Sequence, residues 1–223
     1  MSDLVQSKMI SAPCSSCVRK TMHDILYETA QHEEHCIDTY ALLRCRGCST
    51  ISLGHQERWL DDGKTEHTYY PSPVSRKTPD WVIWLAIGFS TASKAESELG
   101  SLLTEIYQAV DGGQHRLAAM GIRALLEQVM ILKVGDHQTF DNNLDEFQKG
   151  GYLSLLQRDA MSATLNVGHA AMHRAFKPTE EDLKVALDVV EGVLAPIFAH
   201  KEAAEKLADR IPPRPPRPKK GTI

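Results

Sequence analysis

Four cysteines in the first fifty residues have the types and spacing of a metal site. Cys14 and Cys17 form one C-x2-C pair, and Cys45 and Cys48 form a second pair after 27 intervening residues. A C-x2-C turn directs both sulfurs to one centre, so two such turns complete a tetrahedral thiolate set for Zn²⁺. The spacing predicts one structural zinc ion per chain, with iron–sulfur ligation as the alternative. A redox role is disfavoured because redox C-x-x-C pairs occur singly and beside a βαβ pattern.

Other potential ligands lie between the two cysteine pairs. The fifth cysteine, Cys36, is interpreted as a buried apolar thiol, with a role as a substitute ligand as the alternative. His23, His32 and His35 are interpreted as surface residues or as residues that contact the ligands. Because four thiolates close the coordination sphere, the metal is expected to stabilise the fold and to do no chemistry.

The candidates for catalysis lie much later in the chain. His169 and His173 are four residues apart in NVGHAAMHR, so on a helix they point the same way. Ala170 stands where the H-E-x-x-H motif has its general base, which argues against a metalloprotease. Arg123 and Glu127 form an i, i+4 pair in GIRALLEQVM. The structural alternatives are hydrogen-bonded histidines that pack a helix end and an ordinary boundary ion pair.

Two kinds of secondary structure must position these residues. The apolar residues from Ile37 to Leu43 and the STISL run after the second cysteine pair predict a small β-hairpin ribbon. After residue 80, apolar residues at helical spacing predict about five helices. Thr179 and Asp182 match a capping box at the start of the last helix, and Pro196 predicts a kink in it. The expected core stripes include Leu117, Leu125, Leu132 and Leu156.

These elements define the expected domain organisation. The sequence predicts a mainly α protein in which a zinc ribbon precedes an antiparallel helical bundle. The expected segments are a zinc-ribbon domain at 1–69, a linker at 70–79, a helical domain at 80–209 and a basic, proline-rich tail at 210–223.

Charge and hydropathy narrow the classes of partner. Residues 80–209 hold 11 basic and 19 acidic side chains, whereas residues 210–223 hold five basic and none acidic. The acidic helical domain repels phosphate backbones, so contact with RNA or DNA would need the ribbon or the tail. No apolar run is long enough for a membrane span and no signal peptide is visible, so a cytoplasmic protein without a membrane partner is expected.

The order of several segments resembles a known family. The cysteine pairs, GIRALLE, GYLS and NVGHAAMHRAFKPT follow one another as in a bacterial domain family of unknown function that is often attached to restriction enzymes. That family is similar to a branch of the HEPN superfamily of helical bundles, and the likeness extends to about Phe198. The resemblance implies a HEPN-like bundle, and a protein of a restriction or phage-defence system, or a second copy of the chain, as partner.

The resemblance also implies two competing functions. Catalytic HEPN domains cleave RNA without metal through an Arg-x4–6-His motif at a dimer interface, and His173 corresponds to the motif histidine. Positions 166–168, and positions 162–164 if His169 is taken instead, hold no arginine. A non-catalytic binding or scaffolding module is therefore favoured. The alternatives are an endoribonuclease that uses Arg123 or Arg174 with the histidines, and a regulator that binds a nucleotide or metal through them.

Overall fold

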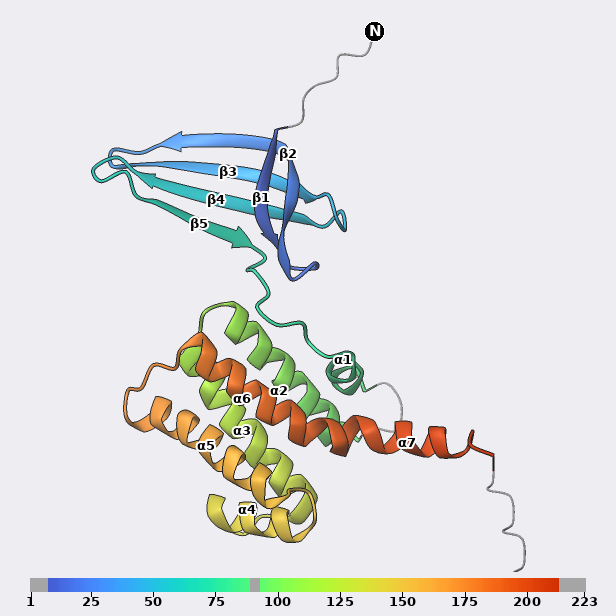
Figure 1. Ribbon diagram of the computed structural model, residues 1–223. Coiled ribbons are helices and arrows are strands. Elements are labelled where there is room, and N and C mark those ends of the chain that lie inside the picture. Colours follow the sequence, from blue (N-terminus) through green and yellow to red (C-terminus); the bar gives the residue numbers. More distant parts are fainter. Residues whose placement is uncertain (1–7, 89–92, 213–223) are drawn as a thin grey trace, which may run out of the picture. The chain divides into compact units, whose positions relative to one another are not determined.

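A computed structural model describes residues 8–88 and 93–212 of the chain (Figure 1). The chain divides into two compact units, which are described separately below. One comprises Met1–Thr78 with Tyr107–Gln114, and the other comprises Pro79–Ile106 with His115–Ile223. The predicted domain boundaries at 69 and 80 stay predictions, and positions 213–223 of the predicted tail lie outside the described residues.

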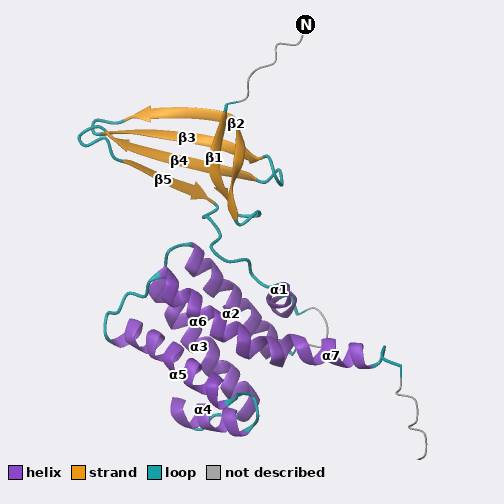
Figure 2. Ribbon diagram, viewed as in Figure 1, coloured by secondary structure: helices purple, strands orange, loops and turns teal. Residues whose placement is uncertain are grey.

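The first unit contains one antiparallel sheet with the strand order β1-β2-β3-β4-β5 (Figure 2). Its strands are β1 Met9–Cys14, β2 Arg19–His32, β3 Cys36–Cys45, β4 Ile51–Trp59 and β5 Thr65–Tyr70. The prediction of a mainly α protein with a small hairpin ribbon is therefore wrong, because the sheet has five strands and the protein is mixed. The hairpin predicted around the second cysteine pair exists as β3 and β4, within the larger sheet.

The inner face of the sheet encloses a small apolar core. Ala12, Ala41 and Leu43 are buried there, and Tyr69 packs against them. Gly54 lies where space is tightest, because a Cβ atom there would approach Leu43 Cδ1 to 3.2 Å and Tyr69 Cε1 to 3.4 Å. So few buried apolar residues give little hydrophobic stabilisation, and the unit needs a further source of stability.

The described residues of the second unit form helices and the connections between them, with no strand. The helical elements are α1 Asp80–Ala86, α2 Lys94–Asp111, α3 His115–Val134, α4 Phe140–Lys149, α5 Leu155–His173, α6 Glu180–Ala195, the π-helical turn η1 Pro196–His200 and α7 Lys201–Ala208. The C-terminal end of α2, from Tyr107, is counted with the first unit. The residues from 80 to 111 hold two helices, α1 and α2. Helix α5 carries both candidate histidines.

Helix boundaries follow local signals that the sequence displays. The Thr179 capping box is confirmed, and Ser154 forms a second one with Gln157 at the start of α5. Helix α6 ends just before Pro196, where the backbone changes to a π-helical turn. No helix in the described segments combines the length and the apolar composition needed to cross a membrane.

Helix α3 forms the centre of the helical core and packs against α4, α5 and α6. Its buried residues include the predicted Leu125, together with Leu126 and Val129. The predicted inward positions Leu117 and Leu156 are wrong, because these side chains are 56% and 83% exposed. Leu132, also predicted to face the core, is exposed as well.

Candidate metal centre

Two turns with the same backbone geometry carry the four cysteines. One joins β1 to β2 and the other joins β3 to β4. The Val18 amide donates to the Cys14 carbonyl at 2.9 Å, and the Ser49 amide donates to the Cys45 carbonyl at the same distance. Val18 and Ser49 both have left-handed φ angles, 52° and 63°. Each turn is thus closed just after its second cysteine, which directs both sulfurs of the pair inward.

The turns bring the four sulfurs together at one end of the sheet. Cys14 Sγ lies 3.5 Å from Cys48 Sγ, and Cys17 Sγ lies 3.8 Å from Cys45 Sγ. All four sulfurs are within 4.8 Å of one another. Sulfurs bound at about 2.3 Å around a tetrahedral ion are about 3.8 Å apart, so the cluster fits a single metal ion. The sequence prediction that these four cysteines form one group is consistent with this geometry.

Hydrogen bonds support the sulfurs from outside the cluster. The Cys17 amide donates to Cys14 Sγ at 3.4 Å, and the Gly47 amide donates to Cys45 Sγ at 3.3 Å. The Thr21 hydroxyl lies 3.2 Å from Cys45 Sγ. Thr21 was not identified from the sequence as a residue that supports the site, because its position beside sulfur depends on strand pairing.

The protein divides the four thiols into two kinds. The hydrogen bond with Thr21 lowers the pKa of Cys45 to about 5, and bonds with Thr50 lower the pKa of Cys48. Contact with Cys48 raises the pKa of Cys17 to about 12, and burial raises the pKa of Cys14. The second pair therefore favours thiolates while the first retains protons. A bound cation would replace those protons and allow four thiolates.

The other candidates between the cysteine pairs lie in different environments. Cys36 and Cys45 occupy opposite ends of β3, so Cys36 is not a substitute ligand for this cluster. It is buried, as the first interpretation expected. His23 is only 1% exposed, and its Nδ1 lies 3.0 Å from the Thr21 carbonyl. His23 is the direct register partner of Cys45, so it packs next to the cluster, whereas His32 and His35 are exposed.

In the helical unit the two candidate histidines lie close together, whereas Arg123 makes its contacts with other residues. The rings of His169 and His173 lie 4.7 Å apart on α5. His173 is exposed, so it is not the buried histidine of the structural alternative. Arg123 donates from Nη1 to the Leu165 carbonyl at 3.4 Å, and its guanidinium lies 4.4 Å from the centroid of the Phe140 ring. The arginine thus ties α3 to α5 and to the start of α4.

Positive charge nevertheless reaches the histidines. Burial, followed by the charges of His173, Arg123 and Arg174, lowers the pKa of His169 from 6.5. Both causes disfavour the protonated ring, so they keep His169 neutral and at the same time weaken it as a base. Within the described residues, Glu127 forms no ion pair with Arg123, so the i, i+4 spacing does not produce the expected contact.

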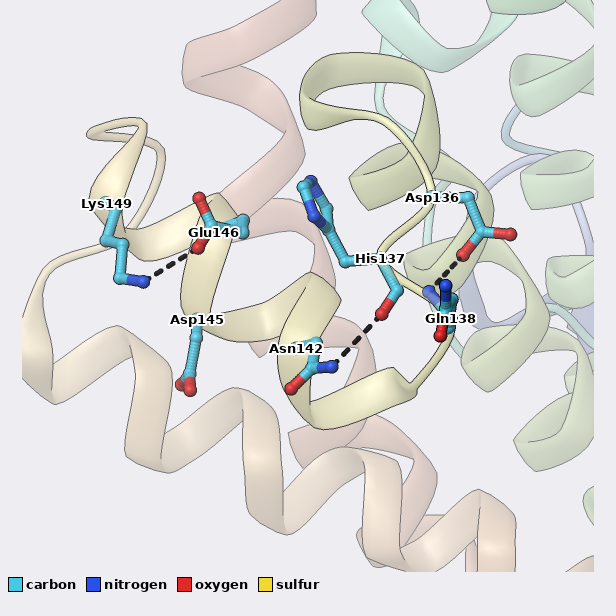
Figure 3. A pocket seen from close by; sticks show the side chains of 7 residues that line it. All are labelled: Asp136, His137, Gln138, Asn142, Asp145, Glu146 and Lys149. Atoms are coloured by element: carbon cyan, nitrogen blue, oxygen red, sulfur yellow. Dashed lines mark hydrogen bonds and ion pairs between the residues drawn. The ribbon is translucent and has the colours of Figure 1, made fainter.

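A polar cleft lies elsewhere in the helical unit, at the connection between α3 and α4 (Figure 3). Asn142 Nδ2 donates to the His137 carbonyl at 3.1 Å, and Lys149 pairs with Glu146 at 2.7 Å. The sequence indicated only a helix end here. Because these lining groups bond to one another, the cleft lacks the convergent free polar groups of a binding site.

The geometry thus defines a protein with a tetracysteine β-sheet unit and a helical unit. Residues 104–211 match a protein family described as "Domain of unknown function (DUF4145)". That match runs from within α2 to just beyond α7 and leaves the sheet outside. Comparisons with curated proteins and with solved structures found no match. None of these findings bears on restriction enzymes or on the HEPN superfamily.

Proposed function

We propose that Cys14, Cys17, Cys45 and Cys48 bind one structural Zn²⁺ per chain. The observation that carries this is the convergence of all four sulfurs within 4.8 Å at the ends of two equivalent turns. Thiolate-only donors favour zinc among the common hard and borderline divalent ions, and the closed set leaves no position for substrate. Metal analysis of the purified chain after dialysis against a weak chelator should give about one zinc per chain. A metal-free protein whose sheet is fully folded would contradict the assignment.

We further propose that the zinc-stabilised sheet is a non-catalytic binding module for another protein. Four side chains lie in direct register across β2, β3, β4 and β5, on the face opposite Leu43. They are Tyr27, Leu42, Leu53 and Tyr70, with exposed fractions of 65%, 38%, 37% and 53%. We call these four residues the apolar row. A contiguous exposed apolar patch that contains tyrosines is typical of protein interfaces.

The charges around the apolar row favour a protein over a nucleic acid. On the row's own face, Asp24 pairs with Arg44 at 3.4 Å and with Arg46 at 3.8 Å. These two arginines are therefore partly neutralised. On the other side of the row, Asp38 and Glu57 face each other across β3 and β4. Carboxylates there disfavour a phosphate backbone, which needs an uncompensated basic surface.

Quantitative affinity capture can test the binding module. The full chain should enrich specific proteins, and the double variant Tyr27→Ser/Leu53→Ser should lose them while it keeps its zinc and its circular dichroism. Leu156→Ser is a matched control, because it removes an exposed leucine from α5. A purified partner should then bind the row variant at least about tenfold more weakly. Unchanged binding by that variant, or capture of RNA alone, would contradict the proposal.

We also propose that this binding module acts in restriction or phage defence. This role is supported by the resemblance of GIRALLE and NVGHAAMHR to a family of that association, including its kinship with HEPN proteins. A second copy of the chain is one partner that the capture experiment distinguishes, by mass. Deletion of the gene should change the efficiency with which phages form plaques on the host. If a broad panel of phages formed plaques with equal efficiency on the deletion strain and on the parent strain, the role in phage defence would be contradicted.

The second candidate is a metal-independent endoribonuclease. The observation that favours it is the proximity of the His169 and His173 rings on α5. Against it stands the commitment of Arg123 to Leu165 and Phe140. Cleavage of RNA by wild type in the presence of a chelator, lost in a stable His173→Ala variant, would place this function first.

A further inference from the structure

A second group of metal-ligating side chains lies on the outer face of the sheet. Cys36 and Asp38 are two residues apart on β3, so they point to the same face. Glu57 on β4 is the direct register partner of Asp38. The ligand atoms of these three residues all lie within 4.8 Å of one another. Sulfur and oxygen donors at about 2.0–2.3 Å from one ion have separations within this limit.

A histidine fixes the orientation of the central carboxylate. His55 Nε2 lies 2.6 Å from Asp38 Oδ1, and the His55 ring stacks on Tyr40 with a centroid distance of 4.6 Å. The other oxygen, Asp38 Oδ2, lies 3.7 Å from Cys36 Sγ, which donates to it. Carboxylates that bind a metal are commonly held in position by hydrogen bonds from neighbouring groups. His55 thus holds Asp38 with one oxygen turned towards Cys36.

The charges at this position favour a cation. Asp38 faces Glu57 across β3 and β4, and Glu57 faces Glu66 across β4 and β5. Like charges at directly opposed positions destabilise a sheet. Within the described part of the chain, Glu57 forms no ion pair that would offset this repulsion. Arg58, the next residue, points to the opposite face because successive side chains alternate.

From this geometry we infer that Cys36, Asp38 and Glu57 form a second divalent-metal site, distinct from the four-cysteine cluster. One thiolate and two carboxylates suit Zn²⁺ or Co²⁺, whereas the sulfur disfavours Mg²⁺ and Ca²⁺. Three protein ligands leave one tetrahedral position open for water or for a group from a binding partner. The first cluster is closed, so this second site is the one that exchanges its metal and accepts an outside ligand.

Cobalt titration of the full chain tests the inference. The protein is first dialysed against a weak chelator until only the zinc of the four-cysteine site remains, and Co²⁺ is then added. We expect one further equivalent to bind, with the near-ultraviolet charge-transfer absorption of a single cobalt–thiolate bond. Cys36→Ser should lose that absorption, and Glu57→Gln should bind Co²⁺ at least about tenfold more weakly.

Two further variants distinguish a specific metal site from nonspecific attraction of cations to the carboxylates. His55→Gln should weaken Co²⁺ binding by about 10- to 100-fold, because it releases the orientation of Asp38. Glu66→Gln is the matched control, since it removes an exposed carboxylate opposite Glu57 but outside the ligand group. It should bind Co²⁺ like wild type. Absence of a further equivalent, equal weakening by Glu66→Gln and Glu57→Gln, or charge-transfer absorption that persists in Cys36→Ser would each overturn the inference.

Discussion

The cysteine cluster and the arginine–histidine region differ in how their geometry arises. Each C-x2-C pair is shaped by its own turn, and the equivalent closures at Val18 and Ser49 direct the sulfurs inward. In the helical unit, i, i+4 spacing only places side chains on one helix face. Packing between helices then decides their contacts, and it turns Arg123 towards Phe140. Local turns therefore allow a site to be predicted from spacing, whereas helix spacing alone does not.

Removing one thiolate from the cysteine cluster is expected to have the largest effect on the stability of the protein. Cys45→Ser deletes a buried ligand that also accepts hydrogen bonds from Thr21 and Gly47. Structural zinc contributes about 10–16 kcal/mol in small domains, which exceeds what the small apolar core of this sheet supplies. We expect loss of the zinc and unfolding of the sheet, while the helical unit keeps its circular dichroism signal and its own melting transition.

The matched control for this variant is Cys36→Ser, which makes the same chemical change outside the cluster. It should retain the zinc of the four-cysteine site and a folded sheet. Metal analysis and amide hydrogen exchange would follow the two variants. A Cys45→Ser protein with protected β-strand amides and no metal would show that the cluster does not stabilise the sheet.

What the sequence could predict follows the same division between local and distant effects. The cysteine cluster, the Thr179 capping box and the break at Pro196 each depend on a few adjacent residues, and all three were readable. The full sheet was not readable, because strands such as RKTMHDILYETAQH lack a clear alternation of apolar and polar residues. The group formed by Cys36 and Glu57 depends on strand register, which spacing along one strand does not specify.

The helical unit shows why its site residues resisted prediction. Leu156 fits an apolar stripe on α5, yet it is exposed because α5 packs through a different face. That face is set by Gly168, which lies against Ala119 and Arg123 of α3. A glycine in NVGHAAMHR could equally indicate room for a substrate, and only the packing shows that another helix fills the space.

The next largest effect is expected at this glycine. A Cβ atom at Gly168 would lie 2.7 Å from the Ala119 carbonyl oxygen and 2.8 Å from Arg123 Cβ. Gly168→Ala must therefore separate α3 from α5, at a cost of about 1–3 kcal/mol in the free energy of unfolding. Gly192→Ala on α6 is the control, because nothing lies within 4 Å of its Cβ position. It should stabilise by up to about 1 kcal/mol. Equal effects of the two variants in urea denaturation would show that α3 and α5 do not pack closely.

Substitutions of Arg123 and Glu127, which the sequence predicted as an ion pair, should have smaller and unequal effects on stability. Arg123→Ala loses the contact with Phe140 and the bond to the Leu165 carbonyl, which together are worth about 1–2 kcal/mol. Glu127→Ala should change stability by less than about 0.5 kcal/mol. The double variant should show the sum of the two effects. A coupling energy as large as the Arg123→Ala effect itself would show that the pair forms in solution.

The smallest effect concerns the pH dependence of the helical unit. Burial and the charges of His173, Arg123 and Arg174 lower the pKa of His169 below 6.5. As pH falls below about 6.5, the unfolded chain takes up a proton at this position that the folded chain resists. His169 therefore contributes a loss of stability that begins there and ends once pH is below its folded pKa.

His169→Gln should flatten this part of the stability profile, measured by urea denaturation at a series of pH values. His200→Gln, which replaces an exposed histidine of the same unit, should leave the profile unchanged. If His169→Gln instead steepens the loss in acid, the imidazole is stabilised as a cation, and the arginine charges do not reach it.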